Sequence, residues 1–431
     1  MKLPSLLLAV LLLSGCVSAG PARESLDSIA SDYVDLQLAV GEKEEGYIDA
    51  YYGPLERKAD AVVLAHGRSP RQLAARAAVL SVRLRSLTDA HLAPLERRRR
   101  DFLLAQLRAA STRLRMIQGE KLAFADEAEG LFGVRPELKP LATYDPVLAR
   151  IERLVPGKGP LSDRVDAFQE RFTIPRDRLE PVMRAAIAEC RRRTAGHIAL
   201  PANERFTLEF VTGKSWGGYN WYKGDNHSLI QINTDLPVRI GRAVDLGCHE
   251  GYPGHHVYNM LLEEKLAKAR GWVEFTLYPL YSPQSFIAEG SANYGIELAF
   301  PDDDQLEFEM KILYPLAGLP AASASKYLAL HRATQDLAGA RFTIAADYLD
   351  GRIDRARAVE LTRKYQLFSP ARAEKSVAFV DQYRSYVINY GLGLDMVRAA
   401  VERAGADPAR RWAAMEKLLS EPTLPRDLEA P

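Results

Sequence analysis

The sequence contains little cysteine, no excess of charge of either sign, and no apolar run long enough to cross a membrane as a mature helix. Three cysteines occur among 431 residues, so a dense disulfide framework is excluded. The formal net charge is +1 at pH 7, so no global positive field attracts nucleic acid. The densest basic cluster, residues 97–100, lies in a helical pattern without interleaved aromatic residues and indicates a solvated helix face. We therefore expect no nucleic-acid partner.

The N-terminus has the pattern of a secretory signal. Lys2 precedes an apolar run over residues 6–13, which is too short to span a bilayer. The small residues Ser14 and Gly15 then lead to Cys16, an ending that resembles a bacterial lipobox, in which the cysteine is lipidated. A plain signal peptide cut near residue 19 is the alternative. We expect a signal peptide over residues 1–15 and a lipid anchor on Cys16 that holds the protein in the cell envelope, facing the periplasm.

Two further cysteines, Cys190 and Cys248, remain in the mature chain. An extracytoplasmic protein could pair them. A chain of this size builds a large core that needs no disulfide, so two buried thiols are the preferred interpretation. Metal ligation by Cys248 is a third alternative, because it adjoins a histidine-rich segment.

Apolar periodicity and proline positions predict a mainly α fold. The stretches 70–87 and 94–117 each open with a proline and carry apolar residues at helical spacing. Residues 206–211 alternate at period two, and 219–222 and 228–233 are further strand candidates, which together predict a small antiparallel sheet. We expect a tether over residues 16–25, a helical region over 26–199 and a metal-site region over 200–431, packed as one compact unit.

Three of the eight histidines fall within residues 249–256, the segment His-Glu-Gly-Tyr-Pro-Gly-His-His. A His-Glu pair on a helix, with a second histidine on the same face, is typical of zinc hydrolases. His249 would bind one Zn²⁺ ion, and Glu250 would act as general base toward the metal-activated water. A cluster of surface histidines at a kinked helix, without metal, is the alternative.

The spacing departs from the regular motif, because Pro253 stands where the second histidine is expected. In an ideal helix His255 lies about 120° off the face of His249, and His256 lies about 10 Å along the axis. Pro253 disrupts the helix and Gly254 permits unusual backbone conformations. A bulge of two residues would bring His255 to the metal, and a bulge of three would bring His256. We prefer His255 as the second ligand and keep His256 as the alternative.

Catalytic zinc needs a third protein ligand. Glu289 is the best candidate, 40 residues after His249 on a predicted helix with an apolar face. Asn293, one turn later, could orient a ligand through a hydrogen bond. Glu297 is a weaker alternative.

These motifs resemble the bacterial domain-of-unknown-function family 885. The resemblance rests on the specific His-Glu-x-x-Pro-Gly-His-His string and on Glu289-Gly290, with support from segments 46–54, 232–237 and 383–390. It covers nearly the whole mature chain and implies a large helical, zincin-like metalloprotein that encloses zinc in a deep channel. Ser291 stands where a bulky aromatic residue is frequent in the family.

Further roles follow by analogy with helical zincins. The strands before the motif would offer an edge to an extended peptide, with residues 215–222 lining the groove. Tyr386 or Tyr390 would donate a hydrogen bond to the oxyanion, and Arg384 would bind a substrate carboxylate. Core packing is the alternative for these three residues. The expected function is a zinc-dependent peptidase acting on short peptides; the alternatives are a zinc amidase or other hydrolase, and a metal-free binding lipoprotein.

Overall fold

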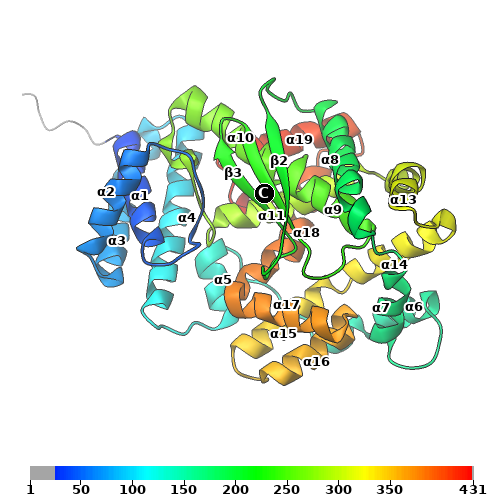
Figure 1. Ribbon diagram of the computed structural model, residues 1–431. Coiled ribbons are helices and arrows are strands. Elements are labelled where there is room, and N and C mark those ends of the chain that lie inside the picture. Colours follow the sequence, from blue (N-terminus) through cyan, green and yellow to red (C-terminus); the bar gives the residue numbers. More distant parts are fainter. Residues whose placement is uncertain (1–24, 430–431) are drawn as a thin grey trace, which may run out of the picture.

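The computed structural model describes residues 25–429, and helices form most of it, as the periodicity predicts (Figure 1). The α-helices are α1 Leu26–Gly41, α2 Leu55–His66, α3 Pro70–Ser86, α4 Pro94–Ile117, α5 Phe124–Phe132, α6 Asp145–Leu154, α7 Leu161–Glu170, α8 Leu179–Ala195, α9 Gly241–Leu246, α10 His255–Leu262, α11 Pro283–Ala299, α12 Asp304–Phe308, α13 Tyr314–Ala317, α14 Ala324–Gln335, α15 Ala338–Leu349, α16 Arg355–Gln366, α17 Pro370–Tyr383, α18 Ile388–Glu402 and α19 Pro408–Ser420. None of the helices within residues 25–429 combines the length and the apolar character that a membrane-spanning segment requires.

Local sequence signals fix the starts of the early helices. At α3, the Ser69 side chain accepts a hydrogen bond from the Gln72 backbone, and the Gln72 side chain accepts one from the Ser69 backbone. At α4, the Glu96 carboxylate accepts a hydrogen bond of 2.8 Å from the Ala93 backbone. These bonds satisfy donors that a helix end leaves free. The predicted helices at 70–87 and 94–117 are therefore confirmed to within one residue.

The predicted sheet is present but mixed. Its strands are β2 Arg205–Val211, β3 Gly218–Gly224 and β4 His227–Asn233, in the order β2-β4-β3. The β3–β4 hairpin is antiparallel, as expected, whereas β2 runs parallel to β4 and corrects that part of the prediction. The reason is that β2 and β3 lie on opposite sides of β4, so the chain between them crosses the end of β4. Two backbone hydrogen bonds mark this crossing, from Thr234 N to Val211 O and from Asn233 N to Gly217 O.

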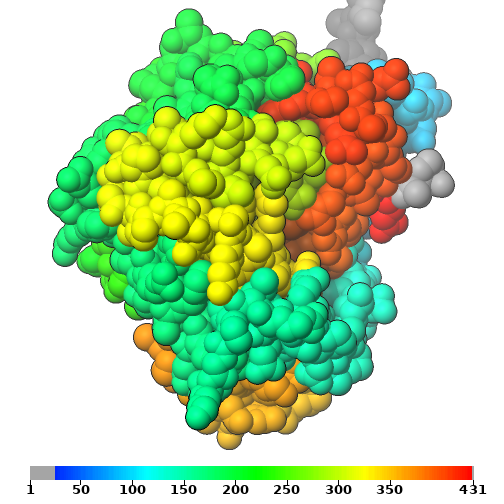
Figure 2. Space-filling view, turned by 90° about the vertical axis from the view of Figure 1, so that its right-hand side faces the viewer, coloured from blue at the N-terminus to red at the C-terminus, as the bar shows by residue number. Residues whose placement is uncertain are grey.

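A second, two-stranded sheet joins distant parts of the chain. Strand β1 Ile48–Tyr51 pairs antiparallel with β5 Leu277–Pro279. Early and late helices also meet: α6 packs on α14, and α7 packs on α16. In the side view, the teal segment of α6 and α7 lies directly against the yellow segment of α12–α14 (Figure 2). The cavity described below is accordingly lined by residues far apart in the sequence, from Asp49 of β1 to Tyr390 of α18.

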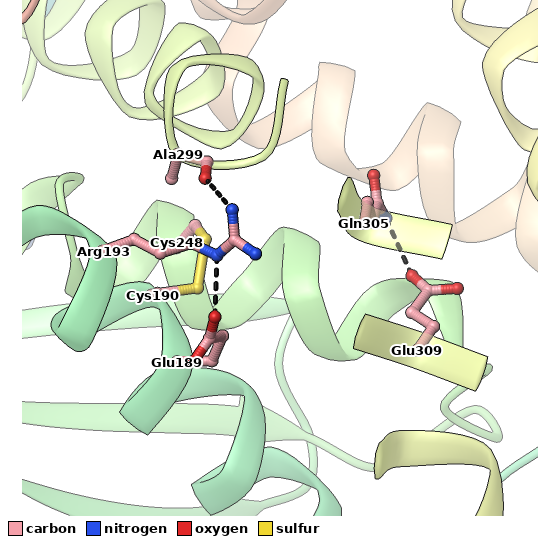
Figure 3. The surroundings of a disulfide bond; sticks show 7 residues. All are labelled: Glu189, Cys190, Arg193, Cys248, Ala299, Gln305 and Glu309. Atoms are coloured by element: carbon pink, nitrogen blue, oxygen red, sulfur yellow. Dashed lines mark hydrogen bonds and ion pairs between the residues drawn. A yellow bond between two sulfur atoms is a disulfide. The ribbon is translucent and has the colours of Figure 1, made fainter. Parts of the chain in front are cut away.

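Cys190 of α8 and Cys248 form a disulfide bond, with both side chains fully buried (Figure 3). The preferred interpretation of two free thiols is thus wrong, and the paired alternative is right. The cross-link spans 58 residues, and closing a loop of this length in the unfolded chain stabilises the fold by about 4 kcal/mol in the chain-entropy model. The disulfide links α8 covalently to Cys248, the residue directly before His249.

Candidate metal centre

The histidine segment is a break between two helices rather than one bulged helix. Helix α9 continues as a wide π-helical turn, η4 Gly247–Gly251, and the chain then becomes extended at Tyr252. A new helix, α10, begins at His255. The Gly254 N–H donates to the Cys248 carbonyl at 3.0 Å. A Cβ atom on Gly254 would lie 1.8 Å from the His249 carbonyl oxygen, so only glycine allows this return of the backbone.

The break brings His255 to His249, and α11 adds Glu289. The candidate ligand atoms of the three residues lie within 4.8 Å of one another. Nε2 of His249 is 3.1 Å from Oε2 of Glu289, and Nε2 of His255 is 3.7 Å from Oε1 of Glu289. Ligand atoms around a tetrahedral zinc with bonds of about 2.0–2.1 Å are separated by roughly 3.3 Å. The three side chains therefore have spacings that suit one zinc ion.

The hydrogen bonds around His249 and Glu289 leave two acceptor atoms facing each other, which is a test of whether a cation fits there. Nδ1 of His249 lies 3.1 Å from Oδ1 of Asn293, whose amide nitrogen donates to the Tyr390 carbonyl at 3.1 Å. This network assigns the ring proton of a neutral His249 to Nδ1 and leaves a lone pair on Nε2 facing Glu289. Oε2 of Glu289 is buried without a hydrogen-bond partner. A metal ion would satisfy both groups.

The electrostatic environment of His255 and Glu289 favours the protonation states that metal ligands need. Burial lowers the pKa of His255 to about 4, so its ring is neutral near pH 7. Burial alone would raise the pKa of Glu289, but His255, His249 and the Tyr386 hydroxyl together bring it below its usual value. A neutral imidazole and an ionised carboxylate are the forms that coordinate metal.

Glu250 is buried beside the three candidate ligands, and it lines the same cavity. Its backbone carbonyl accepts a hydrogen bond of 2.7 Å from the Asn220 side chain in β3. Burial and, to a smaller extent, the Glu289 carboxylate raise the pKa of Glu250 to about 7, against the opposing charge of His249. A carboxylate with a pKa near the working pH can both accept and return a proton.

His256 points away from this centre. Its Nδ1 lies 2.8 Å from the Ser228 hydroxyl, and its Nε2 lies 3.1 Å from Glu204, with no part of the side chain exposed. His256 therefore joins α10 to β4 and to the loop before β2. The geometry brings His255, and not His256, to His249 and Glu289.

The three late residues have different surroundings. Tyr386, in the turn η9 Arg384–Val387, donates a hydrogen bond of 2.8 Å to Glu289. Tyr390 of α18 stacks beside His249 with ring centroids 6.2 Å apart, and both tyrosines line the cavity. Arg384 instead forms a 2.7 Å ion pair with the buried Glu127 and is not among the cavity-lining residues. The prediction that Arg384 binds a substrate carboxylate is corrected, because its guanidinium is committed to this pair.

A cavity of about 590 Å³ opens onto the centre, and residues 215–220 form part of its wall, as predicted for the groove. It also contains residues that sequence reasoning missed. Asp49 of β1 lines it and accepts a hydrogen bond from Tyr219, and burial raises the pKa of Asp49 to about 7. The only sequence signal for Asp49 was its place in segment 46–54, since β1 reaches the site through its pairing with β5. Arg341 of α15 lines the cavity as well.

Comparisons with known proteins give structural neighbours only. No family model matches the chain, and no curated protein matches it. A putative lipoprotein from Colwellia psychrerythraea is similar at a TM-score of 0.47 and 16% identity, over 85% of this chain and 69% of that one. An M32 carboxypeptidase from Deinococcus radiodurans R1 is similar at a TM-score of 0.39 and 14% identity, over 91% and 88%. Membership of family 885 stays a prediction from the sequence.

Proposed function

We propose that this protein is a zinc-dependent peptidase that hydrolyses short peptides at the centre formed by His249, His255 and Glu289. The observation that carries the proposal is the convergence of these three side chains beside a buried glutamate of raised pKa. Two histidines and a carboxylate leave a fourth position for water or substrate, which is the arrangement of catalytic zinc. A purely structural site would be closed by a fourth protein ligand.

Zinc, when bound, would acidify a water molecule and polarise the carbonyl of the scissile amide. Glu250 would accept the proton from that water as its oxygen forms a bond to the carbonyl carbon. As the carbon–nitrogen bond breaks, Glu250 would deliver the proton to the leaving amine. Its raised pKa supports both transfers near neutral pH.

Tyr390 is the better of the two tyrosines for stabilising the oxyanion. The Tyr386 hydroxyl already donates to Glu289, so its role is to hold that ligand. The Tyr390 ring lies beside His249, and no described residue pairs with its hydroxyl in a hydrogen bond. A hydroxyl aimed at the developing negative charge typically contributes a few kcal/mol to a transition state.

The cavity dimensions favour a small peptide or an acylated amino acid over a protein. Its volume of about 590 Å³ lies within the range of small-ligand sites. β3 is an outer strand of its sheet, and its first residues line the cavity. We propose that the substrate backbone pairs with this strand.

We further propose that the protein works in the bacterial cell envelope, facing the periplasm, with Cys16 as its lipid anchor. Cys16 lies outside the described residues. The Cys190–Cys248 disulfide supports an oxidising, extracytoplasmic compartment.

The proposal is tested by comparing wild-type protein with Glu250→Gln. We expect about one zinc ion per chain in both proteins, because the ligands are untouched. Only the wild type should cleave a library of two- to six-residue peptides, and kcat should fall by at least a hundredfold in the variant. Absence of stoichiometric metal would overturn the metal centre. If the wild type binds metal but cleaves none of the peptides, the peptidase assignment is wrong, and hydrolysis of other amides becomes the better proposal.

A further inference from the structure

Several cations line the cavity, and among the described residues all but one of them have an anionic or hydrogen-bonding partner. Arg239 pairs with Asp166, Arg242 with Asp245 and Lys375 with Asp235. Arg372 donates to the Pro237 carbonyl at 2.9 Å. Arg341 of α15 forms no ion pair with any carboxylate of the described residues.

Aromatic rings, rather than anions, surround Arg341. Its guanidinium carbon lies 5.0 Å from the ring centre of Phe379 and 5.9 Å from that of Tyr390. These contacts cover the face of the guanidinium but use none of its N–H donors. Its Nε is buried and has no acceptor. Burial lowers the pKa of Arg341, as expected for a cation removed from water without a counter-charge.

The position of Arg341 relates it to the metal centre. The Tyr390 ring that Arg341 contacts is also the ring that stacks beside His249, 6.2 Å away. The guanidinium carbon is therefore no more than about 12 Å from the His249 ring, a distance that at most three or four extended residues are needed to span. If Arg341 binds one end of a peptide, the amide that lies one or two residues from that end would reach the metal.

We propose that Arg341 binds the free α-carboxylate of the substrate, so that the substrates are peptides or N-acyl amino acids cleaved one or two residues from a free carboxyl end. This inference rests on the proposed function and names its substrate class. A guanidinium offers two parallel N–H donors that match a carboxylate, and a desolvated cation without a counter-charge is stabilised when an anion binds. Arg341 thus takes the role that the sequence predicted for Arg384.

Binding to metal-free protein tests the anchor without any catalysis. The probes are five N-acetyl amino acids, those of alanine, leucine, phenylalanine, lysine and glutamate, each beside its carboxamide. Titration calorimetry should show at least one free acid binding about a hundredfold more tightly than its amide. Arg341→Met should abolish that difference, and Lys375→Met, which removes a paired cation of the same wall, should leave it unchanged. Equal binding of acids and amides by the wild type would overturn the proposal.

Arg341→Lys refines the test, because it keeps the charge but loses the planar pair of donors. We expect it to retain part of the preference for the acid. A thermal-unfolding measurement separates binding from folding: Arg341→Met should be as stable as the wild type or more stable, since it removes a half-buried charge that has no counter-charge. An Arg341→Met protein that is less stable than the wild type would overturn the assignment of Arg341 as a cation that the fold leaves unpaired for the substrate.

Cleavage distinguishes failure of the anchor from failure of the proposed function. The zinc-loaded wild type should cleave free-acid peptides near the carboxyl end with kcat/KM about a hundredfold above that of the C-terminal amides. Equal cleavage of acids and amides would overturn the anchor and leave the peptidase intact. Acid-selective binding without cleavage of any peptide would overturn the peptidase and leave the anchor intact.

Discussion

Oδ1 of Asn293 lies 3.1 Å from Nδ1 of His249, although 44 residues separate them in the sequence. The hydrogen bond from Asn293 to the Tyr390 carbonyl fixes the amide so that its oxygen faces the ring. The bond therefore sets both the tautomer and the orientation of His249. Residues from three separate segments, His249, Asn293 and Tyr390, therefore determine that Nε2 of His249 faces the candidate metal centre.

We expect Asn293→Ala to weaken zinc binding by about 10- to 100-fold, because His249 loses the acceptor that orients it. A competition titration against a chelator of known affinity measures the change. Asn259→Ala, which removes a side chain bonded to the His255 carbonyl, is the control for general disturbance of the segment. If Asn293→Ala and the control bind zinc as tightly as the wild type, the orienting role is wrong.

The two neighbouring histidines should respond to substitution in different ways. His255→Ala should lose stoichiometric zinc, because only His249 and Glu289 would remain. His256→Ala should keep the metal but unfold at lower denaturant concentration, since Ser228 and Glu204 lose a buried partner at a cost of about 1–3 kcal/mol. Metal analysis and urea unfolding of both variants check this. The reverse pattern would mean that His256 is the ligand.

Gly218→Ala should impair catalysis while leaving the metal in place. A Cβ atom at this position would lie 2.7 Å from Oε1 of Glu250 and 2.7 Å from Cδ2 of Leu246. The Glu250 carboxylate would have to move, and none of the three atoms nearest to the added Cβ belongs to His249, His255 or Glu289. We expect normal zinc content and a fall in kcat of tenfold or more. Unchanged kinetics would show that the position of Glu250 is not critical.

Substitution of Tyr390 and Tyr386 should separate catalysis from metal binding. Tyr390→Phe should lower kcat by about a hundredfold with little change in zinc affinity, because it removes an oxyanion donor. Tyr386→Phe should weaken zinc binding instead, because it frees an oxygen of Glu289. Kinetics at saturating zinc, together with chelator competition, distinguish the two effects. Equal loss of kcat in both variants would contradict the division of roles.

Stability should depend on pH through Glu309 in the π-helical turn η7 Glu309–Leu313. Burial raises the pKa of this carboxyl to about 7 in the folded protein, from a usual value of 4.5. Below pH 4.5 the group is protonated in both states. Between pH 4.5 and 7 the unfolded chain releases the proton first, so stability falls as the pH rises, by up to a few kcal/mol. Glu309→Gln, a mimic of the protonated form, should remove this loss.

Urea unfolding of metal-free protein at pH 5 and pH 8 measures that effect. The free energy of unfolding of the wild type should fall between the two conditions by more than that of Glu309→Gln. At pH 8 the variant should be the more stable protein. Parallel changes in both proteins would mean that Glu309 is ionised in the fold without cost.

Features that depend on neighbouring residues could be predicted from the sequence. Helix starts at Pro70 and Pro94 follow from caps and proline geometry within one turn. The strands and the mainly helical fold follow from apolar spacing. The grouping of His249, Glu250 and His255 around Pro253 and Gly254 singled out the site, because histidine and glutamate at such spacing have few uses other than chemistry.

Features that depend on contacts between distant segments could not be predicted in this way, because they are set by the tertiary structure. It ended the helix at Tyr252 and restarted it at His255, which turned His256 toward Ser228 instead of Glu289. It paired Cys190 with Cys248, and it made a mixed sheet of an expected antiparallel one. Arg384 and Arg341 show the physical reason most clearly. Both arginines lie in helical segments, so the sequence alone does not distinguish them. Packing places Arg384 against Glu127, which neutralises it, and leaves Arg341 facing the cavity without a counter-charge.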